Sequence, residues 1–281
     1  MVRARRRFGQ HFLEPAWVQK LVDAIAPQAT DSFIEIGPGR GAITAPLAAR
    51  AGRIVAIEVD RDLAQALTHR GLKGVSVVTA DVLDVDLLQI ADSIVAAQPE
   101  SSAPSLRVVG NLPYNISSPI LFRLLAASTS GRFEDATLML QHEVAERLTA
   151  KPGTGEYGVL TLSTAIWADV TTLLTLPPGA FRPMPKVRSS VVRLAFRPPP
   201  TSVTRPELLV PIVRSVFTQR RKTLANALAP FASARGLSAQ ALLAAAGIDG
   251  IRRPETLSLE EFARVTSAVA SAGPASDVSP T

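Results

Sequence analysis

Cysteine is absent from the sequence, and histidine is scarce. Without cysteine the chain can form no disulfide bond, no thiolate metal site and no cysteine nucleophile. The three histidines, His11, His69 and His142, lie far apart and lack the spacing of metal ligands. We therefore expect a function that uses no bound metal.

Long apolar runs are missing as well. No stretch approaches the ~18 apolar residues that a membrane-spanning helix requires. The arginines near the N-terminus are not followed by the apolar segment of a signal peptide. We expect a cytoplasmic protein without a membrane partner.

Apolar content and charge distribution limit the fold class and the partner. Apolar residues make up 47% of the 281 residues, enough for an α/β domain of about 200 residues with a small appendage. Residues 181–281 hold 14 Lys and Arg against 6 Asp and Glu, whereas residues 1–180 hold 16 against 18. Together with a basic arm at residues 3–7, this suggests a polyanionic partner, most simply nucleic acid. A solvated surface of an arginine-rich protein is the alternative explanation.

Short apolar runs alternate with helix-like segments in the first two thirds of the chain. The expected strands are 32–37, 53–59, 75–81, 106–111 and 136–141, and the helices include 43–51, 61–69, 117–127 and 142–149. Nearly continuous apolar strands are typical of a parallel sheet covered on both faces. Two later runs, 163–176 and 186–196, have no helix-length segment between them, which predicts a final antiparallel pair. The pattern therefore indicates an α/β fold with a doubly wound, mostly parallel sheet.

The last third of the chain has a different pattern. A Pro-rich segment near residue 200 precedes four helix-like segments, at 208–218, 221–234, 238–246 and 258–270. We therefore expect one domain over residues 1–198, a small all-α domain over 199–272 and a disordered tail over 273–281.

A glycine-rich turn follows the first expected strand. Gly37, Gly39 and Gly41 allow the backbone to turn sharply and to approach a ligand at the start of a helix. With Ala42 the spacing also fits GxGxxA, so a dinucleotide-binding fold stays open. No Lys or Ser/Thr follows the glycines as in a P-loop, which argues against a triphosphate.

Acidic residues end the next two strands. Glu58 can accept hydrogen bonds from ribose hydroxyls, and Asp81 lies at a height suited to an adenine amino group. We expect Val82, which follows Asp81, to contact the cofactor as well. A further acidic residue, Glu35, lies within the first strand. An acidic nucleoside site without a phosphate clamp suits S-adenosylmethionine, whose sulfonium is positively charged.

The fourth strand ends in Asn111-Leu112-Pro113-Tyr114. The Asn111 side-chain carbonyl and the Leu112 backbone carbonyl can accept hydrogen bonds from an exocyclic amine, favouring the geometry and charge it develops while attacking a methyl group. Tyr114 offers a ring on which a flipped base can stack. An Asn-Pro turn that caps the helix at 117–127 is the simpler alternative.

Three motifs give this sequence a specific resemblance. NLPYNIS (111–117), EIGPGRGAIT (35–44) and RRRFGQHFL (5–13) resemble the ribosomal RNA adenine N6-dimethyltransferases. FTQRRKTLANAL (217–228) and RRPETLSLEEFARV (252–265) are closer to the small-subunit (KsgA-type) branch than to the erythromycin-resistance branch. The resemblance implies a Rossmann-like class I methyltransferase sheet with S-adenosylmethionine as cofactor. It also implies dimethylation of two adjacent adenosines in the 3′-terminal hairpin of 16S rRNA, coupled to small-subunit biogenesis.

The resemblance also assigns roles to residues. It implies that His11 and Leu13 close over the cofactor, that Gly37 lines its methionine end, and that Asn111 touches both the cofactor and the target amine. It further implies that Phe181 faces Tyr114 across the target adenine. One departure is visible, because the family usually has Asn where His11 stands.

The basic C-terminal segments gain a role from the same resemblance. We expect Arg220, Arg221 and Lys222 to contact phosphates of the ribosomal RNA. The expected partner is the immature 30S subunit, and the expected state of the chain is a monomer.

Three other functions stay open from the sequence. One is dimethylation of 23S rRNA, which confers macrolide resistance. Another is a ribosome assembly factor whose catalysis is dispensable, and the third is a dinucleotide-dependent dehydrogenase, which the fold alone permits.

Overall fold

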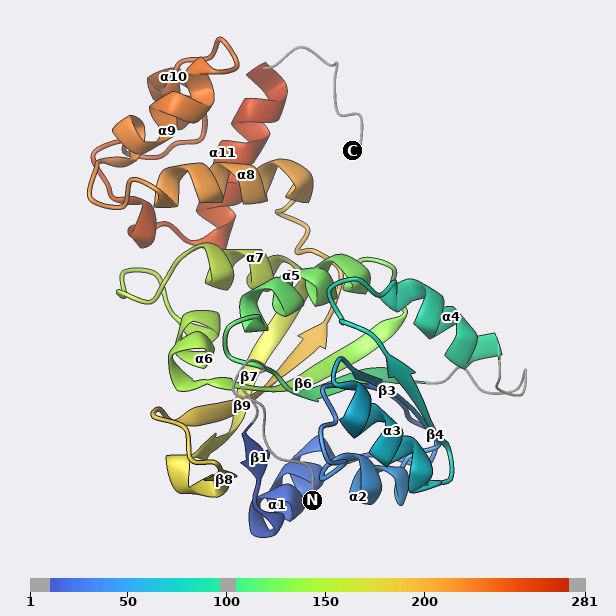
Figure 1. Cartoon of the computed structure of the whole chain (residues 1–281). Coiled ribbons are helices and arrows are strands. Elements are labelled where there is room, and N and C mark those ends of the chain that lie inside the picture. Colours follow the sequence, from blue (N-terminus) through green and yellow to red (C-terminus); the bar gives the residue numbers. More distant parts are fainter. Residues whose placement is uncertain (1–10, 97–104, 273–281) are drawn as a thin grey trace. The chain divides into compact units, whose positions relative to one another are not determined.

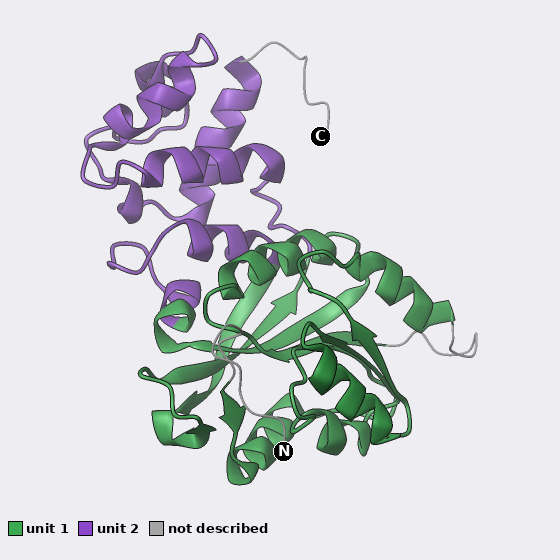
Figure 2. Cartoon of the chain, viewed as in Figure 1, with its two compact units in different colours: residues 1–145, 168–197 green, residues 146–167, 198–281 purple. Residues whose placement is uncertain are grey.

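The computed structural model describes residues 11–96 and 105–272. Contacts divide the chain into two compact units, residues 1–145 with 168–197 and residues 146–167 with 198–281 (Figure 2). The first unit ends at residue 197, one residue before the expected end of the first domain at residue 198. Residues 146–167, which the sequence analysis assigned to the first domain, join the helical unit instead. The expected tail at 273–281 lies outside the described residues.

A seven-stranded sheet forms the centre of the first unit (Figure 1). Its order is β4-β3-β2-β5-β6-β9-β7. The strands are β2 (Ser32–Ile36), β3 (Arg53–Glu58), β4 (Val75–Thr79), β5 (Leu106–Asn111), β6 (Phe133–Gln141), β7 (Ala168–Leu176) and β9 (Ser189–Phe196). The pairs from β4 to β6 are parallel, whereas β9 is antiparallel to both β6 and β7. The expected α/β fold with a final antiparallel pair is confirmed.

The strand order places a switch point at β2. The chain leaves β2 toward β3 on one side and later returns to β5 on the other side. At such a point the loops at the carboxyl ends diverge and leave a crevice for a ligand. The helices of this unit are α1 (Pro15–Ile25), α2 (Thr44–Ala48), α3 (Arg61–His69), α4 (Leu87–Ala96), α5 (Ser117–Ser128) and the first part of α6 (His142–Thr149).

A short antiparallel pair lies beside the sheet. Strand β1 (Phe12–Leu13) pairs with β8 (Phe181–Arg182), so that Leu13 lies opposite Phe181. The short 3-10 helix η2 (Pro178–Ala180) leads into β8. The pair joins segments that are about 170 residues apart in the chain, and for this reason no local pattern predicts it.

The expected strand over 163–176 is wrong in its first part. Helix α7 (Val159–Trp167) occupies residues 163–167, and β7 begins at Ala168. Most of α7 is buried, including Leu162, Thr164 and Ile166. A short apolar run that is rich in Thr is compatible with a buried strand and with a buried helix, and periodicity alone does not separate them.

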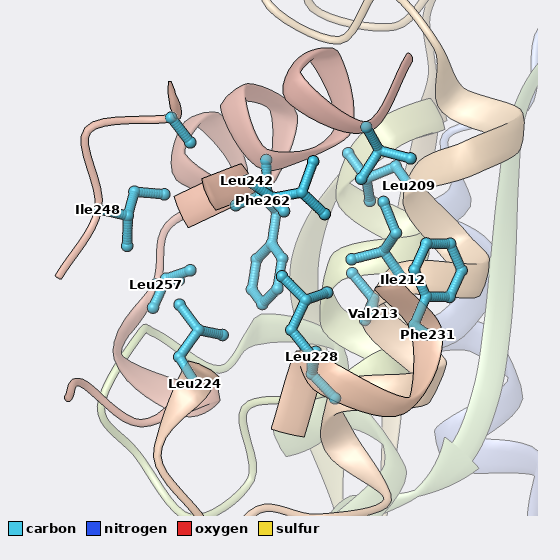
Figure 3. Close-up of a cluster of buried hydrophobic side chains, with 14 of the residues drawn as sticks. Leu209, Ile212, Val213, Leu224, Leu228, Phe231, Leu242, Ile248, Leu257 and Phe262 are labelled. Atoms are coloured by element: carbon cyan, nitrogen blue, oxygen red, sulfur yellow. The ribbon is translucent and has the colours of Figure 1, made fainter. Parts of the chain in front are cut away.

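The second unit is helical. It contains α7, α8 (Pro206–Phe217), α9 (Leu224–Ser233), α10 (Ala239–Ala245), the 3-10 helix η3 (Pro254–Thr256) and α11 (Leu259–Ala272). Apolar side chains of these helices form one core, with Phe262 lying among Leu228, Leu242 and Leu257 (Figure 3). The four expected C-terminal helices are confirmed. Among the helices that the structure describes, none has both the length and the apolarity to cross a bilayer.

Candidate active site

A cavity opens at the switch point of the sheet, at the carboxyl ends of β2, β3, β4 and β5. It is also lined by β1 and the segment just before it. Ten residues that the sequence analysis singled out line this cavity: His11, Leu13, Gly37, Gly39, Glu58, Asp81, Val82, Asn111, Leu112 and Tyr114. Residues from five separate segments of the chain are thus brought together at one edge of the sheet.

The glycine turn after β2 lets the backbone form one wall of the cavity. Gly37 has a φ of 67° and Gly39 a φ of 58°, values that L side chains rarely adopt. A Cβ on Gly39 would lie 3.2 Å from Cε1 of Phe12, so a side chain there would crowd strand β1. Glycine at this position therefore allows β1 to close against the turn.

Glu58 is held at the end of β3 by two backbone N–H groups. Its Oε2 accepts from Gly39 N at 2.9 Å, and its Oε1 accepts from Asp60 N at 2.9 Å. Burial raises the pKa of this carboxyl, and the charge of Asp60 adds to the increase, while the two backbone N–H groups lower the pKa. The hydrogen bonds fix the carboxylate at the cavity wall.

A second acidic residue lies one strand away. Glu35 in β2 is 1% exposed, and its Oε2 has no hydrogen-bond partner among the described residues. Burial, together with the nearby charge of Glu58, raises the pKa of Glu35 to about 7. The end of β2 thus holds a buried acidic group near Glu58 that is partly protonated at neutral pH.

Asp81 follows β4. Its Oδ1 accepts a hydrogen bond from Leu83 N at 2.9 Å, which orients the side chain at the strand end. The lining of the cavity, over the part of the chain that the structure describes, includes the carboxylates of Glu58 and Asp81 but no Lys or Arg. Such a lining suits a ligand that is neutral or positively charged, and it offers no charged clamp for a phosphate.

Asn111 connects the end of β5 to the segment before β1. Its Nδ2 donates to the backbone carbonyl of His11 at 2.9 Å. This bond fixes the rotation of the carboxamide, so Oδ1 lies on the opposite branch of the side chain. The next residue, Leu112, is 1% exposed, and its N–H donates to the carbonyl of Met139 at 3.1 Å, which anchors the turn to β6.

Tyr114 is the last residue of the same turn, and it lines the cavity. Its hydroxyl is 2.7 Å from Oγ of Ser189, at the start of β9. Burial raises the pKa of the phenol, so the group stays neutral. The sequence analysis did not identify Ser189 as part of the site, since a serine at the start of a strand carries no signal of this contact.

Phe181 lies outside this cavity. Its ring is fully buried in the apolar core of the first unit, with Leu13 and Leu21 among the members of that cluster. Phe181 does not line the cavity, and its expected place opposite Tyr114 across the target adenine stays a prediction. The ring that stacks on Tyr114 is that of His11.

The expected RNA-binding residues belong to the helical unit. Arg220 donates from Nη2 to the carbonyl of Gly155 at 2.9 Å and lies over the ring of Phe217. Arg221 and Lys222 are exposed. Several other basic residues within residues 181–281 are paired with acids, including Arg193 with Asp135 at 2.6 Å.

Comparison with known sequences identifies close relatives over nearly the whole chain. The family model described as "Ribosomal RNA adenine dimethylase" matches residues 1–270. The "Ribosomal RNA small subunit methyltransferase A" of Nitrosococcus oceani is 45% identical over 268 residues, covering 94% of this chain and 95% of that protein. The protein of the same name from Xylella fastidiosa is 42% identical over 269 residues, covering 94% of this chain and 96% of that protein.

Two solved structures share the fold. A dimethyladenosine transferase from Plasmodium falciparum has a TM-score of 0.73 at 24% identity and covers 91% of this chain and 96% of its own. The 23S rRNA methyltransferase ErmE has a TM-score of 0.63 at 26% identity and covers 92% of this chain and 99% of its own. Both comparisons extend over the sheet and the helical unit.

Proposed function

The chain belongs to the ribosomal RNA adenine dimethylase family, and from this premise we propose that it dimethylates N6 of adenosine in small-subunit ribosomal RNA. The proposed target is the pair of adjacent adenosines in the 3′-terminal hairpin of 16S rRNA, within the immature 30S subunit. The relatives at 42–45% identity are named as small-subunit enzymes, whereas the 23S enzyme ErmE is 26% identical. This difference favours the small-subunit substrate over the large-subunit one.

One observation carries the proposal. The Asn111–Tyr114 turn, which can hold an amine and stack a base, lines the same cavity as the glycine turn and two carboxylates. A dehydrogenase has no use for that turn, and an assembly factor without catalysis has no need of its hydrogen-bonded geometry. The arrangement therefore supports methyl transfer.

S-adenosylmethionine is the proposed cofactor, and the residues present fit it. A Cβ on Gly39 would crowd the cavity wall, the lining is acidic without Lys or Arg over the described residues, and Glu35 keeps a buried carboxylate oxygen unpaired. Gly37 would hold the methionine end, Glu58 the ribose and Asp81 with Val82 the adenine. When bound, the cofactor supplies an electrophilic methyl group on a positively charged sulfonium.

The proposed catalytic task of the protein is to make the amine of adenine nucleophilic. The lone pair of N6 is conjugated with the ring, so the nitrogen must move from planar toward tetrahedral geometry before it attacks. Oδ1 of Asn111 and the carbonyl oxygen of Leu112 would accept hydrogen bonds from the two N–H groups of the amine and stabilise the positive charge that develops. Since Asn111 Nδ2 is already engaged with His11, the side chain presents an acceptor and not a donor.

Tyr114 would position the base. The contact of its hydroxyl with Ser189 would fix the ring at the cavity, where an extruded adenine can stack. The helical unit would hold the RNA through Arg221 and Lys222. This substrate places the proposed activity in the cytoplasm, and we propose that one chain acts as a monomer.

Nucleoside analysis tests the proposal. The protein is incubated with labelled S-adenosylmethionine and immature small subunits from a strain that lacks this methylation, and the RNA is then digested to nucleosides. We expect the label in N6,N6-dimethyladenosine. Label in another nucleoside, or labelling of naked 23S rRNA in preference to small subunits, would refute the proposed substrate.

A further inference from the structure

The imidazole of His11 stacks against the Tyr114 ring in a laterally displaced arrangement. The two ring centroids lie 5.6 Å apart, and the ring planes are inclined by 22°. Both side chains line the cavity, whereas Phe181 is buried outside it. Tyr114 is the ring on which the target adenine is proposed to stack, so the His11 ring already lies against part of the surface that the base would use.

The separation of the two rings leaves no room for a base between them. Aromatic carbons in contact are about 3.5 Å apart, so a base between His11 and Tyr114 would need a centroid separation of about 7 Å. The observed 5.6 Å is shorter than this. The target adenine and the His11 imidazole therefore compete for this face of Tyr114.

The contacts of His11 divide between its backbone and its ring. The backbone carbonyl accepts the hydrogen bond from Asn111 Nδ2 at 2.9 Å. The ring stacks on Tyr114, and its Nδ1 lies 2.7 Å from the carbonyl oxygen of Pro183. A change of side-chain rotamer can therefore remove the ring from Tyr114 while the bond that orients Asn111 stays in place.

We propose that the His11 imidazole stands in for the target base: it covers Tyr114 in the free enzyme and is displaced when the adenine enters. This inference rests on the proposed function, because the displaced ring makes way for the adenine that is to be methylated. His11 is thus a positioning residue that keeps the site assembled but opposes substrate binding. The contacts that entry breaks are the Tyr114 stack and the hydrogen bond to Pro183.

Substrate kinetics give the first test. Replacing His11 by Asn removes the competing ring and keeps a polar side chain. We expect the KM for immature small subunits to fall at least about five-fold in His11→Asn, since an aromatic stack of about 1 kcal/mol and the imidazole contact with Pro183 are no longer broken on entry. A purely structural or cofactor-binding role would leave this KM unchanged or raise it, and that result would overturn the inference.

Histidine NMR gives a second test that needs no methyl transfer. The chain has three histidines, so its Hε1 spectrum has three signals, which His69→Gln and His142→Gln assign by elimination. The ring current of Tyr114 should shift the His11 signal upfield in the full-length protein. We expect this shift to be lost in Tyr114→Leu, while the other two signals stay in place.

Displacement is then followed with adenosine monophosphate as the probe base, after S-adenosylhomocysteine has filled the cofactor site. We expect the His11 signal to move in the direction seen in Tyr114→Leu. An unchanged signal at concentrations of adenosine monophosphate that inhibit methylation would overturn the inference. If N6 of adenosine is methylated but the His11 signal does not move, only this inference is refuted. If the His11 signal moves but small subunits are not methylated, only the proposed substrate is refuted.

Discussion

At the residue scale, Asn111 combines a structural bond with a proposed catalytic one. Its Nδ2 donates to His11, and its Oδ1 is assigned to the target amine. We predict that Asn111→Ala lowers kcat by about 100-fold or more, because a preorganised partner of the developing charge is lost. The measurement is the initial rate of label transfer to immature small subunits.

The chain offers a matched control for this substitution. Asn226 is exposed on α9, and Asn226→Ala makes the same chemical change away from the cavity. Its rate should stay within about two-fold of the wild-type rate by the same reasoning. Equal rates for Asn111→Ala and the wild-type protein would disprove the role of Asn111.

Glu35 gives a prediction about pH. Its pKa is about 7 in the folded chain against an ordinary 4.5, so between these values the folded state binds more protons than the unfolded state. The free energy of unfolding contributed by this group therefore falls as the pH rises from about 4.5 to above 7. The full change amounts to about 3 kcal/mol.

The substitution Glu35→Gln removes this titration. Relative to the wild-type protein, we expect the variant to gain about 3 kcal/mol of unfolding free energy between pH 4 and pH 8. Urea unfolding at a series of pH values measures the difference. A difference that does not vary with pH would contradict the assignment of a buried, titrating carboxyl.

The site residues differ in how well the sequence predicts them. Gly37, Glu58, Asp81 and Asn111 end successive parallel strands, and such ends meet at one edge of a sheet regardless of details of packing. The contact between His11 and Pro183 joins residues 172 positions apart. Neither that contact nor the burial of Phe181 could be derived from local pattern, because both depend on how β1 pairs with β8.

At the scale of elements, the side chain of Arg107 forms hydrogen bonds with several of them. Arg107 in β5 is 4% exposed and donates to Asp135 in β6, to Asp31 before β2 and to the carbonyl of Ile25 at the end of α1. Burial by itself lowers the pKa of this guanidinium, but the two carboxylates more than offset it and raise the pKa above its ordinary value. The buried charges are thus compensated within one network.

Removing Arg107 takes from this network the cation that both buried carboxylates share, and Asp135 then keeps only its contact with Arg193. We predict that Arg107→Ala lowers the free energy of unfolding by about 3–5 kcal/mol, because Asp31 stays buried without its cation and Asp135 keeps only Arg193. Arg197→Ala is the control, since Arg197 pairs with the largely exposed Asp169 and should cost at most about 1 kcal/mol. Similar losses in chemical unfolding of both variants would show that burial of the network does not matter.

The elements also differ in their predictability. The parallel strands β2 to β6 are short apolar runs bounded by turn residues, and sequence pattern locates them within a few positions. Helix α7 has similar composition, but its state depends on packing against the helical core, to which Leu162 and Ile166 contribute. Tertiary burial, which a local window does not contain, decides between helix and strand there.

At the scale of the whole molecule, the two units carry different proposed tasks. The cavity is formed by the first unit, whereas Arg221 and Lys222 belong to the second. If the second unit holds the RNA by phosphate contacts, substrate binding and methyl transfer should be separable by substitution. We then expect Asn111→Ala to lose methyl transfer but keep RNA binding, and Arg221→Ala/Lys222→Ala to lose RNA binding.

Binding measurements at several salt concentrations test this separation. We predict that Arg221→Ala/Lys222→Ala weakens binding to immature small subunits and lowers the slope of log K against log salt by about 2, one for each lost phosphate contact. Asn111→Ala should bind as tightly as the wild-type protein and with the same slope. Arg205→Ala, which removes an exposed arginine paired with Glu207 in the same unit, is the control for a simple loss of charge. If all three variants show the same slope, the phosphate contacts lie elsewhere, and the helical unit does not hold the RNA through this cluster.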